Sequence, residues 1–229
     1  MSDRSIAGKS VLVTGAFGGI GAALVDAFLK NGASHIYAAS RTPGCATDPR
    51  VIPTALDITS ISDTERLARS IDVDVLVNNA GVNTNTGILA NDDADRARHE
   101  MDVNYFGLLN MCRAFAPQMT ARRAGLIVNM LSSASLSPVP RMGSYCASKA
   151  AAWSLTRCLR AEVEADGVDV LAIFPGATDT RLTAHLTSPK LTPAQVAEGT
   201  VMAILDGLFE HKMKMGVTHL IDMNPAPEA

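Results

Sequence analysis

The sequence predicts an α/β fold: a doubly wound, mostly parallel sheet of about seven strands with helices on both faces. Short runs rich in Val, Ile and Leu alternate with longer amphipathic stretches, which is the pattern of strands that are each followed by a crossover helix. Hydrophobic residues make up 47% of the chain and charged residues 19%, an ordinary globular composition without repeats or linkers. Because 229 residues fit one α/β domain, we expect residues 1–229 to form a single domain.

The strands are predicted from short apolar runs, and the helices from apolar side chains that recur every third or fourth position. Strands are expected at about 10–14, 34–40, 50–56, 73–78, 125–131 and 168–174, with a weaker one near 216–221. Helices are expected at 19–31, which ends at Asn31-Gly32, at 100–121, at 145–166, and at 192–210, which begins at Thr192-Pro193.

The composition argues against several classes of function. A formal net charge of -3 without a long basic run predicts neither a nucleic-acid partner nor a membrane surface. The chain shows no leader pattern and no apolar stretch of about eighteen residues, so we expect a cytoplasmic protein. The four cysteines form no C-x-x-C pair and have no histidine at ligand spacing, which favours reduced thiols over a metal site.

The clearest motif follows the first predicted strand. Residues 14–21 read T-G-A-F-G-G-I-G and lead directly into the helix predicted at 19–31. Glycines at positions 15, 19 and 21 permit a sharp turn, let backbone N–H groups approach a pyrophosphate, and let the helix pack close to the sheet. The N-terminus of that helix favours an anion. A flexible turn without a ligand is the alternative, but the strand before and the helix after favour a Rossmann-type dinucleotide site.

The residues after the second strand indicate which dinucleotide binds. An acidic side chain there would accept hydrogen bonds from the adenosine ribose and favour NAD. The chain instead reads Ala39-Ser40-Arg41-Thr42, so a hydroxyl and a guanidinium are available to a 2′-phosphate. A solvated loop charge is the alternative for Arg41. We therefore expect NADP(H) in preference to NAD(H).

From about residue 8 to about residue 182, the chain resembles the short-chain dehydrogenase/reductase family in its small single-domain branch. Any one of the motifs alone is a weak signal, but together they occur in the family's order. They are T-G-x-x-x-G-x-G at 14–21, Asp57 after the third strand, N-N-A-G at 78–81, the four positions Asn104, Ser132, Tyr145 and Lys149, and P-G-x-x-x-T at 175–180. The resemblance implies an NAD(P)-dependent oxidoreductase similar to carbonyl reductases.

The resemblance and the glycine loop together imply a set of cofactor-binding residues. Asp57 is expected beside the adenine, and Lys149 is implied to bind the nicotinamide ribose as well as to take part in catalysis. The expected set is Gly15, Phe17, Gly18, Gly19, Ile20, Gly21, Ser40, Arg41, Thr42, Asp57, Ile58, Asn79, Ala80, Gly81, Tyr145, Lys149, Pro175, Gly176, Thr178 and Thr180.

The chemistry of carbonyl reduction accounts for the catalytic positions. Reduction needs a proton donor near the carbonyl oxygen and a hydride donor near the carbon, in a site that contains little water. Tyr145 would donate the proton, and Lys149, one turn further along the same helix, would favour the phenolate through its charge. Ser132 would bind the substrate oxygen. The resemblance implies that Asn104 holds a water connecting Lys149 to bulk solvent. A half-buried aromatic beside a solvated lysine is the alternative for the Tyr–Lys pair.

Three serines lie near the predicted site, and we choose Ser132 among them. It stands thirteen residues before Tyr145, the family's usual interval, and Asn129 keeps its usual place ahead of it. Ser133 is expected to point the other way from the end of the strand.

The substrate side is predicted from three segments: 83–88, 134–142, and the stretch from Pro175-Gly176 to about 191. Many of their residues are apolar, and a carboxylate or phosphate substrate would need convergent Arg or Lys, so we expect a neutral, fairly hydrophobic ketone or aldehyde. Arg141, Arg181 and His185 lie in these segments and are expected at the surface. The expected substrate-binding residues are Ser132, Ala134, Met142, Tyr145, Leu182 and Leu186.

The end of the chain departs from the family. After Ile221-Asp222 it lacks the glycine-rich strand end common in this branch, which puts the usual tetramer in doubt. The predicted helices 100–121 and 145–166 are apolar enough to pair across a two-fold axis, so we expect a homodimer or homotetramer.

Two other functions compete with the oxidoreductase. A nucleotide-sensing protein can use this fold without catalysis, although it has no need of Tyr145, Lys149, Ser132 and Asn104 together. The same site also suits imine reduction, dehydration or epimerisation. The short segment after Pro175 leaves little room for the large sugar-nucleotide domain that many epimerases carry.

Overall fold

Seven parallel strands form one sheet in the computed structural model, which describes residues 4–85, 87–89 and 94–213. The sheet confirms the predicted fold class. Its order is β3-β2-β1-β4-β5-β6-β7, so the direction of winding reverses between β1 and β4, where ligands of such sheets bind. The strands are β1 (Ser10–Thr14), β2 (His35–Ser40), β3 (Val51–Ala55), β4 (Val75–Asn78), β5 (Gly125–Met130), β6 (Val168–Pro175) and β7 (Glu210–Met213).

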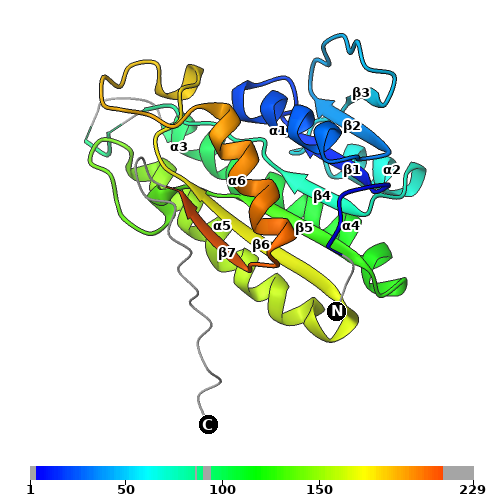
Figure 1. The fold of residues 1–229 in the computed structure, drawn as a ribbon. Coiled ribbons are helices and arrows are strands. Elements are labelled where there is room, and N and C mark those ends of the chain that lie inside the picture. Colours follow the sequence, from blue (N-terminus) through cyan, green and yellow to red (C-terminus); the bar gives the residue numbers. More distant parts are fainter. Residues whose placement is uncertain (1–3, 86, 90–93, 214–229) are drawn as a thin grey trace.

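Helices cover both faces of the sheet (Figure 1). One face packs against α1 (Gly19–Lys30) and α6 (Pro193–Leu205), and the other against α2 (Ile61–Ser70), α4 (Leu108–Ala121) and α5 (Gly143–Val163). Across the described residues, none of the helices combines the length and apolarity that a membrane crossing needs. The pairing of α4 and α5 across a two-fold axis stays a prediction.

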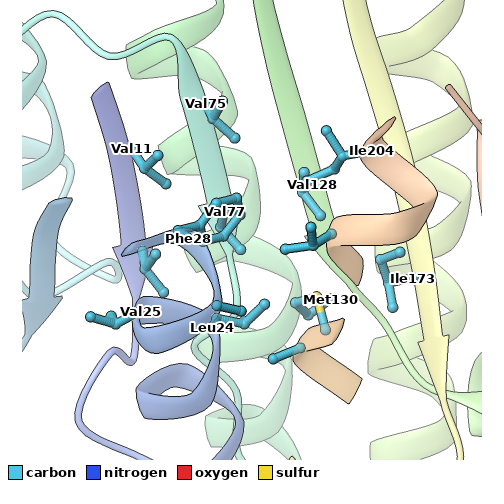
Figure 2. Packing of buried hydrophobic residues seen from close by; sticks show 14 of the residues in the cluster. Val11, Leu24, Val25, Phe28, Val75, Val77, Val128, Met130, Ile173 and Ile204 are labelled. Carbon is cyan, nitrogen blue, oxygen red and sulfur yellow. The ribbon is translucent and has the colours of Figure 1, made fainter. Parts of the chain in front are cut away.

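Side chains alternate along each strand between two hydrophobic layers. Val11 and Val13 of β1 belong to the layer under α1 and α6, whereas Leu12 belongs to the layer under α4 and α5. Figure 2 shows this first layer, to which Phe28 of α1 and Ile204 of α6 both belong. Both faces of the central strands are therefore buried, as the near-continuous apolar runs in the sequence require.

A π-helical segment, η1 (Asp102–Gly107), interrupts the helix predicted at 100–121. The helix before it, α3 (Ala94–Met101), begins earlier than predicted, and α4 continues after it. The helix predicted at 145–166 begins at Gly143 and ends in the short 3-10 turn η3 (Glu164–Asp166). Single π turns are frequent at functional sites, and η1 contains Asn104, one of the predicted catalytic residues.

The helix predicted at 192–210 is shorter in the structure because Gly207 ends it. Gly207 has a φ of +68°, and the N–H of Leu208 donates to the carbonyl of Ala203 at 3.0 Å, a glycine C-cap that the sequence analysis overlooked. The chain then enters β7 at Glu210. The weak strand predicted near 216–221 lies outside the described residues.

A network of hydrogen-bonded, buried polar side chains connects β4, β5 and α5. Asn78 donates to Asn129 Oδ1 at 2.9 Å, and Asn129 donates in turn to Thr156 Oγ1 at 3.0 Å. Thr156 is fully buried and also donates to the Ala152 carbonyl at 2.7 Å. Asn78 Oδ1 has no hydrogen-bond partner among the described residues, so it is the bond from Asn129 to Thr156 that ties α5 to the strands.

Replacing Thr156 by Val should lower the free energy of unfolding by about 1–3 kcal/mol, because it leaves the buried amide of Asn129 without an acceptor. Thr200→Val is the matched control: Thr200 is equally buried, and its hydroxyl donates to its own helix at Val196. Chemical denaturation of both variants measures the difference. Equal destabilisation by the two substitutions would contradict the role given to Thr156.

Candidate active site

A cavity of about 1350 Å³ opens at the carboxyl ends of the strands. Every residue that the sequence predicts to bind cofactor or substrate lines it. Of the four predicted catalytic residues, Ser132, Tyr145 and Lys149 line this cavity, and Asn104 lines a small adjoining cavity that it shares with Lys149. The residues that the motifs select from widely separated parts of the chain therefore come together at one place.

The glycine loop has the geometry of an anion cradle. Gly15 has a φ of +66°, and a Cβ added at Gly21 would lie 2.0 Å from the Gly15 carbonyl oxygen, so neither position tolerates a side chain. Gly18 caps α1 without a side-chain hydrogen bond, and the first turn holds no acidic residue. The positive end of α1 is therefore left to an external anion, which fits the pyrophosphate of a dinucleotide.

Thr14 and Asn79 join the carboxyl ends of β1 and β4 beneath this loop. The hydroxyl of Thr14 accepts from the backbone N–H groups of Asn79 at 2.9 Å and Ala80 at 3.0 Å. The side-chain amide of Asn79 donates back to the Thr14 carbonyl at 2.9 Å. These bonds hold N-N-A-G in register with the glycine loop.

The residues predicted to surround the adenosine lie beyond β2 and β3. Thr59 donates to Asp57 Oδ1 through its hydroxyl at 2.7 Å and its backbone N–H at 2.9 Å. These bonds, and to a smaller extent the charge of Arg41, keep the pKa of Asp57 below its ordinary value. Ser40 Oγ is buried and has no hydrogen-bond partner in the described part of the chain. An unpaired hydroxyl at the end of β2 suits a position that awaits a ligand oxygen.

Asn104 lies in η1, where both groups of its amide are engaged. Its Oδ1 accepts from the Val82 N–H at 2.9 Å, and its Nδ2 donates to the Val82 carbonyl at 2.8 Å and to Ser148 Oγ at 2.9 Å. A lone pair of Oδ1 remains for a water. The adjoining cavity of about 10 Å³ has room for about one water molecule beside Lys149. The predicted water link to Lys149 stays a prediction.

Tyr145 and Lys149 lie one turn apart on α5, and burial affects both. Burial raises the pKa of Tyr145, and a hydrogen bond with Ser132 opposes that rise. Burial also lowers the pKa of Lys149 to about 8, and its ammonium donates to the Met130 carbonyl at 3.1 Å. Burial is the largest cause of the raised pKa of Tyr145. The predicted effect of the Lys149 charge on the phenolate stays a prediction.

The serine positions differ in part from expectation. Ser132 caps the 3-10 turn η2 (Ser133–Ser135), and its Oγ accepts from the Ala134 N–H at 3.1 Å. Ser133 was expected to point away, yet it also lines the cavity. The strand ends at Met130, and the chain then turns into η2, so the alternation of a strand no longer applies.

Sequence reasoning missed one part of the cavity wall. Four residues of this part come from α3 and η1. The second, third and fourth follow the first by three, four and seven positions, so all four lie on one helical face. That spacing is the sequence signal that could have identified them. They are His99, Asp102, Val103 and Phe106.

The segment after β6 forms a loop whose two ends meet. Leu191 N–H donates to the Ala177 carbonyl and Asp179 N–H to the Leu191 carbonyl, each at 2.8 Å, and Lys190 pairs with Asp179 at 2.9 Å. Inside this loop, η4 (Arg181–Thr183) brings Leu182 into the cavity wall. A methyl group of Thr180 lies close to Gly19, so the loop rests on the glycine loop.

The charged residues of the substrate segments are exposed, as expected. Arg141 and His185 lie at the surface away from the cavity, and Arg181 is exposed at its mouth. In the part of the chain that the structure describes, no three His, Cys, Asp or Glu side chains gather as they would around a metal ion.

Among curated proteins, the chain is similar to "Probable oxidoreductase EphD" of Mycobacterium tuberculosis, with 34% identity over 188 residues that make up 76% of this chain. It spans 32% of the length of that protein. It is 30% identical over 224 residues to the 2-(R)-hydroxypropyl-CoM dehydrogenase of Xanthobacter autotrophicus, and the match covers 88% of this chain and 90% of that protein.

A crystal structure of a short-chain dehydrogenase from Burkholderia cenocepacia in complex with NADP superposes with a TM-score of 0.84 and 38% identity. The superposition covers 93% of this chain and 90% of that one. A family model described as short chain dehydrogenase matches residues 9–191. On this match, together with the fold, the chain belongs to the short-chain dehydrogenase family.

Proposed function

We propose that this protein is an NADP(H)-dependent oxidoreductase that interconverts a neutral, fairly hydrophobic ketone or aldehyde and its alcohol. One observation carries the proposal: the glycine loop and the Ser132, Tyr145 and Lys149 side chains line a single cavity at the switch point of the sheet. Loss of NADPH absorbance with a panel of ketones, aldehydes and imines tests it, and a chain that binds NADPH but turns over none of them would be a sensor instead.

The choice of NADP(H) rests on the residues at the end of β2. Arg41 lines the cavity beside Ser40, whose buried hydroxyl has no partner among the described residues. A guanidinium and a hydroxyl together suit a 2′-phosphate, and no carboxylate occupies the position after β2 that would select NAD. Membership of the family supports the binding of NAD(P)(H) in general.

The chemistry assigned to the residues is proton transfer and charge stabilisation. The bound dinucleotide supplies the hydride in reduction. Because burial raises its pKa, the Tyr145 phenol is protonated at neutral pH, the form that donates a proton to a carbonyl oxygen. Ser132, whose hydrogen bond with Tyr145 opposes the rise in the pKa of the phenol, would share that oxygen. The Lys149 ammonium uses one of its three donors on Met130, which leaves two for a ribose.

The substrate class follows from the walls around these side chains. Val139, Met142, Leu182 and Leu186 line the cavity, and Ala134 lies among them. Arg181 is the basic residue of the segment 176–191 that lines the cavity, whereas Lys190 of the same segment pairs with Asp179. An apolar wall with a few convergent polar groups is typical of sites for neutral ligands, which supports a hydrophobic carbonyl compound.

Tyr145→Phe should lower kcat by about 100- to 10,000-fold, because it removes the proton donor. NADPH affinity should stay near that of the wild type, since the phenol is not part of the phosphate cradle. Stopped-flow turnover and calorimetric titration of NADPH measure the two quantities. Retention of more than a few per cent of the wild-type rate would rule out Tyr145 as the acid.

Ser132→Ala should lower kcat by about 100-fold, the usual cost of removing one donor to a developing oxyanion. Ser133→Ala is the control. Ser133 lines the same cavity, but the pKa of Tyr145 is affected by a hydrogen bond with Ser132 and not with Ser133. Equal losses in the two variants would show that the wrong serine has been assigned.

Arg41→Asp should weaken NADPH binding by about ten- to a hundred-fold, the cost of losing a charged hydrogen bond and adding a repulsive carboxylate. NADH binding should change far less or improve. Calorimetric titration of both dinucleotides with both proteins gives the comparison. Tighter binding of NADH than NADPH by the wild type, with no effect of the substitution, would overturn the NADP(H) assignment.

A further inference from the structure

Glu100, near the end of α3, is fully buried, although carboxylates are among the side chains least often found inside proteins. Its Oε1 accepts from the backbone N–H of Thr84 at 2.6 Å and from the Thr84 hydroxyl at 2.8 Å. Its Oε2 accepts from Ser144 Oγ at 2.6 Å. No basic side chain in the described ranges forms an ion pair with it. Three short hydrogen bonds from neutral donors therefore hold the buried carboxylate.

The two partners of Glu100 lie next to residues of different walls of the cavity. Thr84 lies in the segment after β4 and directly follows Val82 and Asn83, which line the cavity. Ser144 lies in the first turn of α5, immediately before Tyr145. Glu100 itself stands four residues, about one helical turn, before Asn104. One carboxylate thus connects three segments that each carry site residues.

The start of α5 has neither a capping side chain nor an acidic side chain of its own. Met142 is its N-cap and makes no side-chain cap hydrogen bond, and its first turn contains no acidic residue. A negative charge near the N-terminus of a helix is favourable, because unpaired N–H groups and the helix dipole point there. Glu100 supplies that charge from α3 through its bond to Ser144.

We propose that Glu100 is a positioning residue: its buried carboxylate holds the first turn of α5 and the segment after β4 in the arrangement in which Tyr145 meets the substrate. This inference rests on the oxidoreductase function proposed above. Glu100 acts through Ser144 and Thr84 and does not itself touch the reacting atoms. Its charge is also felt at Tyr145, whose pKa is raised mainly by burial and further by Glu100.

The test is Glu100→Gln, which keeps the shape of the side chain and removes its charge. We expect kcat/KM for the carbonyl substrate to fall by about ten- to a hundred-fold, the cost of a small misplacement of a reacting group. NADPH affinity should stay as in the wild type, because the bonds of Glu100 run to Thr84 and Ser144 and not to the glycine loop. Tm should fall modestly, because the amide group that replaces one buried oxygen cannot accept a hydrogen bond. Glu162→Gln, the same change at an exposed position of α5, should have no effect.

Ser144→Ala tests the same connection from the other side, in case the Glu100 variant does not fold. Alone it should lower kcat/KM in the same direction, and together with Glu100→Gln it should cost little more than the larger single effect, since both remove one interaction. Amide hydrogen exchange gives a readout that needs no turnover: residues 82–85 and the first turn of α5 should exchange faster in both variants.

The outcomes separate this inference from the proposed function. If the wild type turns over no carbonyl compound, the proposed function fails, while local exchange still decides whether Glu100 fixes the two segments. Wild-type kcat/KM in Glu100→Gln overturns the inference. So do unchanged exchange at both segments, and a loss of NADPH affinity in proportion to the loss of activity, which would mark Glu100 as a general structural residue.

Discussion

The position of the glycine loop relative to N-N-A-G depends on the hydrogen bonds of the Thr14 hydroxyl. This hydroxyl lies where the winding of the sheet reverses, and it accepts from two successive N–H groups of the β4 end while donating to the Val77 carbonyl at 3.3 Å. The Asn79 N–H also donates to the Val77 carbonyl at 3.1 Å, whereas the Ala80 N–H is satisfied by the Thr14 hydroxyl. The glycine loop starts at the next residue, so its place relative to N-N-A-G follows from this hydroxyl.

Burial governs the electrostatics of the catalytic end of the cavity. It raises the pKa of Tyr145 and lowers that of Lys149 to about 8, so both side chains are driven toward their neutral forms. Glu100, close by, is held as a carboxylate acceptor by three hydrogen bonds. The Tyr145 phenol therefore keeps its proton at neutral pH, next to a first turn of α5 that is hydrogen-bonded to Glu100.

The features that the sequence predicted well are local ones. The glycine loop, the Tyr–Lys spacing on α5 and the positions of the strands along the chain each follow from residues close together in the sequence. What could not be predicted depends on contacts between distant segments. The π turn that holds Asn104, the 3-10 turn that carries Ser133 into the cavity, and the burial of Glu100 all arise from packing. The C-cap at Gly207 is the exception, because its glycine was visible in the sequence.

The loop between β6 and α6 is closed at its base by the bonds between residues 177–179 and Leu191. For such a loop, doubling the number of residues costs only about 0.6 kcal/mol of closure entropy. Insertions between its two ends should therefore cost little free energy of folding, as long as Thr180 keeps its contact with Gly19. Such changes would alter the cavity wall at Leu182 and Leu186, while the glycine loop itself is built from the end of β1 and the start of α1.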